Sequence, residues 1–181
     1  MKGRWKHEQE NSYCHRCRGP HRFEFRQTGG SRNIERLQMI ESNLQKDLDW
    51  CEALIQKNSS SFYRAFRNLS RERAQGVFAI YAFCRIADDA IDVDNNPKAV
   101  LDMAEQLEDF ARGETPDEPK WRSLHWAFDT FPLEIEPFRD MLKGQLQDSE
   151  FQQPKNFKAL LDYSYLVAGT VGLMLCPILD H

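Results

Sequence analysis

Apolar residues recur every three or four positions along most of the chain from Met39 onward. The first series of apolar residues comprises Ile40, Leu44, Leu48, Cys51, Leu54 and Ile55. This spacing places them on one face of a helix. The next predicted helix runs from Arg71 to Val93 and is apolar on most sides, which is typical of a helix at the centre of a fold. Between the two, residues 58–61 are rich in hydroxyl groups and suit a loop or a helix cap.

Start and stop signals divide the remainder of the chain. Asn96 followed by Pro97 predicts a helix start, and Gly113 predicts its end. Residues 114–119 form a polar loop. Further helices are predicted over three ranges: 121–128, 137–151 and 156–175. No run of alternating apolar and polar residues competes with these helices, so the predicted fold is all-α.

Residues 1–38 differ from everything that follows. They show no apolar periodicity and hold nine Lys/Arg against four Glu, a net charge of +5, whereas the remainder of the chain carries −9. Such a segment buries too little apolar surface to offset its ordering entropy. We predict a basic, disordered leader, or a start site chosen upstream of a true start at Met39. Residues 39–181 form the predicted helical domain.

Composition narrows the class of protein. The net charge of −4 gives no reason to expect a nucleic-acid partner. The five cysteines are odd in number and scattered, which argues against a disulfide framework. Cys14 and Cys17 have the spacing of half a zinc site but lack a second Cys/His pair. No apolar run follows the basic N-terminus, so no secretory signal is present and a cytoplasmic location is predicted.

The segment from Tyr163 to Leu179 is uncharged for seventeen residues, the lower limit for crossing a bilayer. It contains two glycines and Pro177, and small residues interleave with apolar ones. Glycine inside a helix costs up to about 1 kcal/mol relative to alanine, so its presence indicates close packing or room for a ligand. We predict a buried helix that lines an apolar cavity rather than a membrane span.

The candidate chemistry lies at the end of the central helix. Tyr81, Arg85, Asp88 and Asp92 share one stripe of this otherwise apolar helix, with Asp89 beside them. Two carboxylates one turn apart repel each other, and burying them is costly without compensation. Mg²⁺ bound to phosphate oxygens would supply that compensation, and the arginine could meet a phosphate directly. The alternative is an acidic helix end that simply faces water.

Four blocks of sequence carry a resemblance to a known family: 59–66, 79–92, 143–148 and 163–179. Through them, residues 40–181 resemble the squalene/phytoene synthase family, in particular the bacterial dehydrosqualene and phytoene synthases. The resemblance implies an isoprenoid-synthase helical fold around a central cavity. It also implies a prenyltransferase that joins two farnesyl or geranylgeranyl diphosphates head to head, giving dehydrosqualene or phytoene for carotenoid biosynthesis.

The resemblance also assigns roles to residues. Asp88, Asp89 and Asp92 would bind Mg²⁺, with Asp88, Asp92, Arg85 and Tyr81 as the catalytic set. The residues expected to hold diphosphate are Ser59, Ser61, Tyr81 and Arg85. Those expected to line the site and the channel for the hydrocarbon tails are Phe62, Tyr163, Val167, Val171 and Gly172. For Asp148 the sequence leaves two alternatives: it takes part in the site, or it is exposed on the surface.

The same resemblance predicts that this chain lacks part of the family's fold. The family has a second aspartate-rich motif on a later helix, which this chain does not reach. We therefore expect the C-terminal part of the fold to be absent and the 181-residue chain alone to be inactive and poorly folded. Substrate chain length and the use of NADPH stay open, and the apolar product is compatible with peripheral membrane contact.

Two other interpretations compete with this one. A head-to-tail chain-elongation synthase also uses an Asp-Asp-x-x-Asp motif, although Val93 to Pro97 lack the arginine pair expected after it. A truncated remnant without catalytic activity is the third interpretation.

Overall fold

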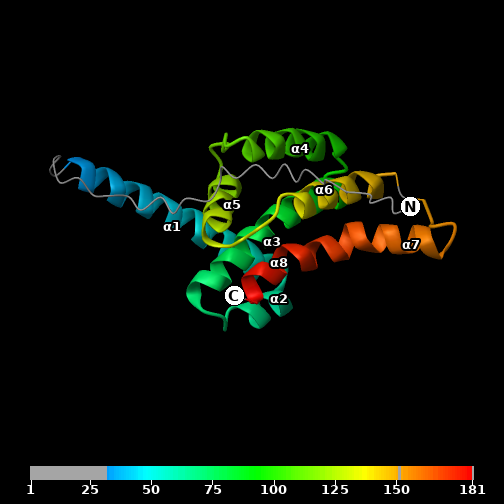
Figure 1. Cartoon of the computed structure of the whole chain (residues 1–181), viewed down its shortest axis with the longest axis horizontal. Coiled ribbons are helices and arrows are strands. Elements are labelled where there is room, and N and C mark those ends of the chain that lie inside the picture. The colour runs from blue at the N-terminus through cyan, green and yellow to red at the C-terminus, as the bar shows by residue number, and fades with distance from the viewer. Residues whose placement is uncertain (1–31, 151, 181) are drawn as a thin grey trace, which may run out of the picture.

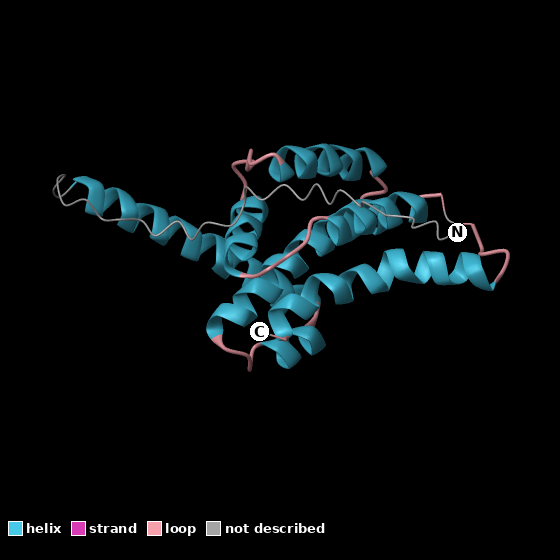
Figure 2. Ribbon diagram, viewed as in Figure 1, coloured by secondary structure: helices cyan, strands magenta, loops and turns pink. Residues whose placement is uncertain are grey.

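The computed structural model describes residues 32–150 and 152–180, and within these ranges every regular element is a helix (Figures 1 and 2). In chain order the elements are α1 (Arg32–Asn58), α2 (Ser60–Phe66), α3 (Arg71–Asp92), α4 (Pro97–Ala111), α5 (Pro119–Thr130), α6 (Glu136–Asp148), α7 (Phe157–Ser164), the π-helical turn η1 (Tyr165–Gly169) and α8 (Thr170–Leu179). The predicted all-α class is confirmed.

Helix α3 lies at the centre of the molecule and packs against α1, α4, α5, α6 and α8. Half of its residues are buried, including Phe78, Ile80 and Phe83. The Phe83 ring makes edge-on contacts with the rings of Trp121 and Phe138, with centroids 5.5 and 5.4 Å apart. This confirms the central position that its all-round apolar pattern predicts.

Helix α1 crosses the core through its C-terminal half and projects from the body through its N-terminal half (Figure 1). Leu48, Cys51 and Ile55 are buried, whereas Ile40 is 55% exposed. The apolar periodicity therefore continues beyond the part of α1 that packs against other helices.

The crossing of α1 and α5 is fixed by a two-point ion pair. Arg122 donates from Nε and Nη2 to the two carboxylate oxygens of buried Asp47, at 2.6 and 2.8 Å. Planar, bidentate geometry makes this the stronger kind of ion pair.

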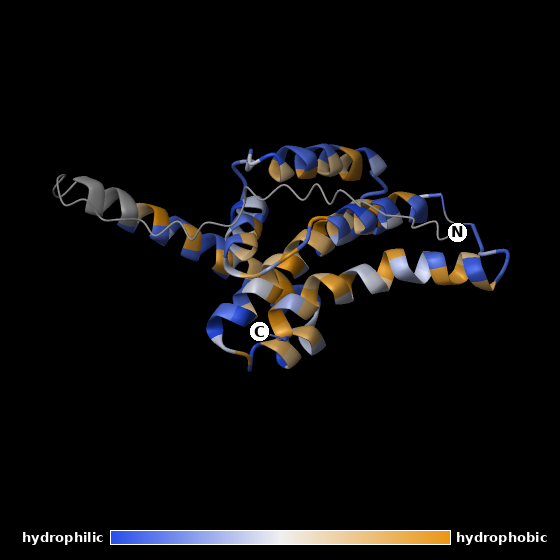
Figure 3. Cartoon of the chain, in the orientation of Figure 1, coloured by the Kyte–Doolittle hydropathy of each residue, from blue (hydrophilic) through white to orange (hydrophobic). Residues whose placement is uncertain are grey.

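The run Phe157–Leu179 is continuous helix through α7, η1 and α8. One stripe of it is buried, comprising Leu166, Thr170, Met174 and Ile178. Within the described part of the chain this is the single helix long and apolar enough to cross a membrane, by length and composition alone. Only 22% of its most apolar window is buried, so the prediction of a buried helix is wrong for the rest of its circumference. Figure 3 shows that the ribbon of α8 is coloured largely as hydrophobic.

Most element boundaries differ from the sequence prediction by one to four residues, and the starts of α1 and α2 differ in a more informative way. Helix α1 begins at Arg32, seven residues before Met39, because a helix propagates into polar sequence more easily than it nucleates. Residues 32–38 are thus helical, and the predicted disorder of residues 1–31 lies outside the described residues. Helix α2 begins at Ser60, within the stretch predicted as a loop or a helix cap, and Ser59 of that stretch is its N-cap residue.

Gly76 provides a test of the packing around α3. A Cβ atom at this position would lie 2.6 Å from Cε2 of buried Phe131 and 3.1 Å from Cδ1 of Ile178. We expect Gly76→Ala to lower the free energy of unfolding by about 1–3 kcal/mol, because overpacking forces the core apart. Urea denaturation measures the change.

Gly172→Ala is the matched control, because within the described ranges no atom outside its own helical backbone and its chain neighbours lies within 4 Å of a Cβ at that position. It should raise stability by up to about 1 kcal/mol through helix propensity. Equal stability of the two variants would contradict the tight contact at Gly76.

Candidate functional site

The predicted stripe lies along the partly exposed edge of α3. Tyr81, Arg85 and Asp88 are half-buried and Asp92 is exposed, one helical turn beyond Asp88. The residues between them, such as Ala87, belong to the core. The apolar sides of the helix are packed, so the polar edge is the part of α3 left for a ligand.

Arg85 is held between two carboxylates of its own helix. Its Nη2 donates to Asp89, and its Nη1 lies 3.5 Å from Oδ2 of Asp88. These charges raise the pKa of Arg85, with the hydrogen bond to Asp89 as the largest cause. Its Nε is buried, and among the described residues it has no hydrogen-bond partner. A buried donor without a partner is unfavourable, and a phosphate oxygen would satisfy it.

Asp88 is the carboxylate most affected by its surroundings. Burial raises its pKa above the ordinary value of 3.8, and the charge of Asp92 raises it further. Hydrogen bonding from Gln145 and the charge of Arg85 act in the opposite direction without cancelling the effect. The ionised form is therefore destabilised in the protein, and a cation near both carboxylates would relieve the repulsion.

Helices α6 and α7 bring two more polar groups to this end of α3. The Tyr163 hydroxyl donates to Oδ1 of Asp148 at 2.9 Å. This bond raises the pKa of Tyr163, burial raises it further, and the charges of Asp148 and Asp92 add to the effect. Of the two positions open for Asp148, the structure shows a half-buried one beside a predicted site residue.

Gln145 is a contact that the sequence interpretation missed. Its Nε2 donates to Oδ1 of Asp88 at 3.3 Å, joining α6 to α3. Gln145 and Asp148 are three residues apart and therefore share one face of α6. That spacing is the signal by which both could have been assigned to the site.

Helix α2 reaches the stripe through an aromatic pair. The ring of Phe62 lies 6.4 Å from the ring of Tyr81, centroid to centroid, and Phe62 is 45% exposed. Ser59 precedes α2 without a side-chain capping bond, and Ser61 is exposed. Phe62 is thus brought to the stripe, while the roles of Ser59 and Ser61 stay predictions.

The remaining predicted residues lie on the flank of η1 and α8. Val167 and Val171 are half-buried, one turn apart, and continue the line of Tyr163. Gly172 is exposed on the adjacent face. Helix α8 also contacts α3 directly, with Cys84 Sγ 3.9 Å from Met174 Sδ.

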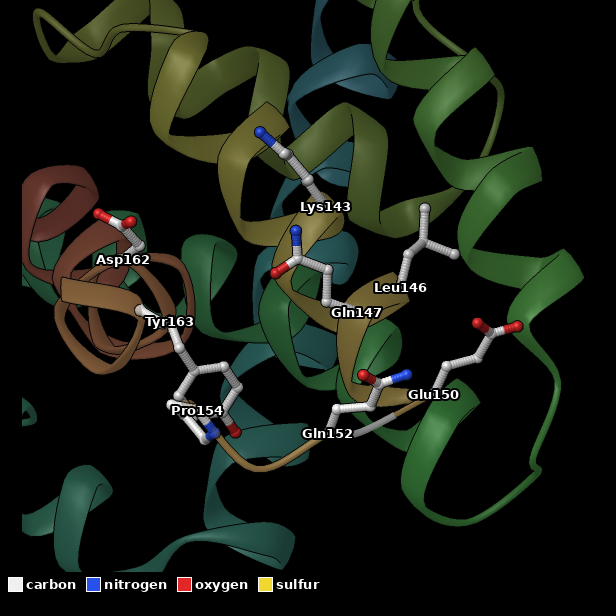
Figure 4. A pocket seen from close by; sticks show the side chains of 9 residues that line it. Lys143, Leu146, Gln147, Glu150, Gln152, Pro154, Asp162 and Tyr163 are labelled. Carbon is white, nitrogen blue, oxygen red and sulfur yellow. The ribbon is translucent and has the colours of Figure 1, made fainter. Parts of the chain in front are cut away.

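A cavity of about 560 Å³ lies between α6 and α7 and reaches Tyr163 (Figure 4). Lys143 and Gln147 line it from α6, and Asp162 lines it from α7. Tyr163 thus takes part in the wall of this cavity as well as in the bond to Asp148.

The two carboxylates at the end of α3 have the donor atoms that Mg²⁺ requires. Asp88 and Asp92 are hard oxygen donors of the kind that Mg²⁺ prefers. Across residues 32–150 and 152–180, no group of three or more His, Cys, Asp or Glu side chains is gathered closely enough to hold a metal alone. Mg²⁺ commonly takes one or two carboxylates and completes its shell with water and phosphate, so the pair fits a cation delivered with a phosphate ligand.

These features define a class of protein: an all-α fold whose central helix carries paired carboxylates and an arginine along one edge. Residues 55–181 match the family model described as squalene/phytoene synthase, and the chain belongs to this family. The predicted family is thereby confirmed.

Individual relatives agree with this assignment. The chain is 33% identical to chloroplastic phytoene synthase 1 of Zea mays over 147 residues, covering 79% of this chain and 36% of that protein. It is 34% identical to chloroplastic phytoene synthase 1 of Arabidopsis thaliana, covering 72% and 32%. A crystal structure of a dehydrosqualene synthase in complex with ligand matches with a TM-score of 0.74 and 50% identity, covering 77% and 49%. The chain therefore spans about a third of the plant proteins and half of the synthase.

The raised pKa of Asp88 predicts that ionisation of this side chain destabilises the folded protein. Between the ordinary pKa of 3.8 and the raised pKa of the folded state, the native protein binds more protons than the unfolded chain. Stability should therefore fall as pH rises through this interval. Asp88→Asn should remove that dependence and raise the melting temperature at pH 7 by on the order of 1 °C.

Calorimetry at a series of pH values measures both effects. Asp94→Asn changes the same charge at an exposed position just beyond α3 and serves as the control. A lower melting temperature for Asp88→Asn at pH 7 would show that Asp88 stabilises the fold in its ionised form.

Proposed function

We propose that this chain provides part of a synthase that joins two prenyl diphosphates head to head. Farnesyl diphosphate would give dehydrosqualene, and geranylgeranyl diphosphate would give phytoene. Family membership and the likeness to a dehydrosqualene synthase support this reaction class. The observation that carries it is the single edge of α3, where Asp88 and Asp92 stand one turn apart beside Arg85.

Each residue of the edge has a task in this reaction. Asp88 and Asp92 would hold Mg²⁺, which when bound neutralises the charge of the leaving diphosphate. Arg85 would bind a phosphate oxygen through its unpartnered Nε. Asp89 keeps the guanidinium in place through its own bond to Nη2. Departure of diphosphate from an allylic carbon is helped most by such fixed positive charge.

The apolar residues next to the edge have a different task. An allylic carbocation survives only where water is excluded, and the faces of aromatic rings stabilise positive charge. Phe62 of α2 lies beside Tyr81, and Tyr163 of α7 lies near enough to Asp92 to be affected by its charge. Val167 and Val171 extend the apolar surface along η1 and α8 for the hydrocarbon tails.

A chimera gives the direct test of this proposal. Residues 55–181 would replace the corresponding region of the similar dehydrosqualene synthase, so that the assay is made on a complete fold. We expect conversion of a prenyl diphosphate to a hydrocarbon free of diphosphate, detected by mass spectrometry. Asp92→Asn should lower the rate by about 100-fold or more, because it removes a carboxylate that holds the cation.

Asp94→Asn is again the matched control, and its rate should equal that of the parent chimera. A longer linear diphosphate as product would support head-to-tail elongation instead. A parental rate for Asp92→Asn would refute the role given to this carboxylate.

A further inference from the structure

Gln145 joins α6 to the acidic edge of α3. Its Nε2 lies 3.3 Å from Oδ1 of Asp88, and the two residues are 57 positions apart in the sequence. Both side chains are half-buried. The contact is therefore a product of tertiary packing and joins the edge to a second helix.

The chemistry of the pair fixes which end of the amide faces Asp88. A carboxylate accepts hydrogen bonds and cannot donate, so an amide oxygen at this distance would repel it. The nitrogen must then face Asp88, and the amide oxygen must point away. Hydrogen-bonding chemistry therefore determines the orientation of the amide, because the oxygen and nitrogen ends have nearly the same shape.

The two oxygens of Asp88 thus have different donors. Oδ2 lies 3.5 Å from Nη1 of Arg85, whose other terminal nitrogen is bound to Asp89. Oδ1 receives the amide of Gln145. An amide fixes the direction of a carboxylate without cancelling its charge, and each carboxylate oxygen keeps a second lone pair for a cation. A lysine in place of Gln145 would compete with that cation.

The position of Gln145 is set by the close packing of α6. The preceding residue, Gly144, is buried, and a Cβ there would lie 3.0 Å from Cβ of Leu166. Three buried side chains of α6, Phe138, Met141 and Leu142, anchor the helix in the core. Gln145 is therefore presented to Asp88 by a rigid element.

We propose that Gln145 is a positioning residue, which holds Asp88 in the orientation that binds a divalent cation. This inference rests on the proposed function, because it requires Asp88 to be a cation ligand. Gln145 itself touches neither cation nor substrate in this proposal. It acts through the carboxylate, as partners of metal ligands commonly do.

Binding of Mn²⁺ to the full chain, followed by electron paramagnetic resonance in the presence of inorganic diphosphate, tests the proposal without an activity assay. Gln145→Met keeps the length of the side chain and removes its donor. We expect Mn²⁺ to bind about ten-fold more weakly to this variant, with the melting temperature unchanged within about 2 °C. Gln145→Ala should show the same loss and serves if the methionine perturbs folding. Gln56→Met changes an exposed glutamine on α1 and should bind Mn²⁺ like the wild type.

A double-variant cycle with Asp88→Asn separates positioning from a general effect. If Gln145 acts through Asp88, Gln145→Met should weaken Mn²⁺ binding no further in the Asp88→Asn background. Equal losses in both backgrounds, or unchanged binding by Gln145→Met and Gln145→Ala, would overturn the inference while leaving the proposed function intact. Failure of the wild type itself to bind Mn²⁺ and diphosphate would refute the cation site, and the inference with it.

Discussion

The burial of α3 on nearly all sides is the constraint on which the site depends. Five helices pack against it, so its polar edge cannot rotate toward water without breaking the core. Asp88 is consequently kept half-buried and close to Asp92, although both effects disfavour its charge. Packing of this kind holds a local arrangement that the carboxylates would not adopt by themselves, and the stability comes from apolar residues such as Phe83.

Two ion pairs in the fold differ in how much hydrogen-bonding capacity they leave unused. Arg122 donates two short hydrogen bonds to buried Asp47. Removing either partner from such a pair leaves the other charge buried without compensation, which is strongly destabilising. Arg85 lies 3.5 Å from Asp88 through one nitrogen, and its Nε has no hydrogen-bond partner within the part of the chain that the structure describes. In the Arg122–Asp47 pair, both carboxylate oxygens accept hydrogen bonds from the arginine. In the Arg85–Asp88 pair, the arginine and the carboxylate can each form further hydrogen bonds. Spare hydrogen-bonding capacity of this kind suits a ligand that brings oxygen atoms.

The sequence was sufficient to predict α3 and its acidic stripe, because a long periodic pattern determines both helix and face. It was insufficient for α2, since seven residues without a buried side chain give no periodic signal. The start of α1 at Arg32 was missed for a related reason, because Ile34 and Leu37 are too few among charged and polar neighbours to give a clear periodic signal. Contacts between helices, such as Gln145 with Asp88, depend on how α6 packs against α3 and cannot be derived from either helix alone.

The geometry of the edge also favours one kind of ligand over another. Two carboxylates with no third metal-binding side chain gathered beside them in the described ranges provide too few donors to dehydrate Mg²⁺. Under the proposed function, a diphosphate would supply the missing oxygens, and the guanidinium of Arg85 beside the carboxylates would attract its charge. Cation and diphosphate should then bind cooperatively, because each completes the coordination that the other lacks. Under the proposed function, such a site would discriminate against free cations and would bind a cation and the charged end of a prenyl diphosphate as a unit.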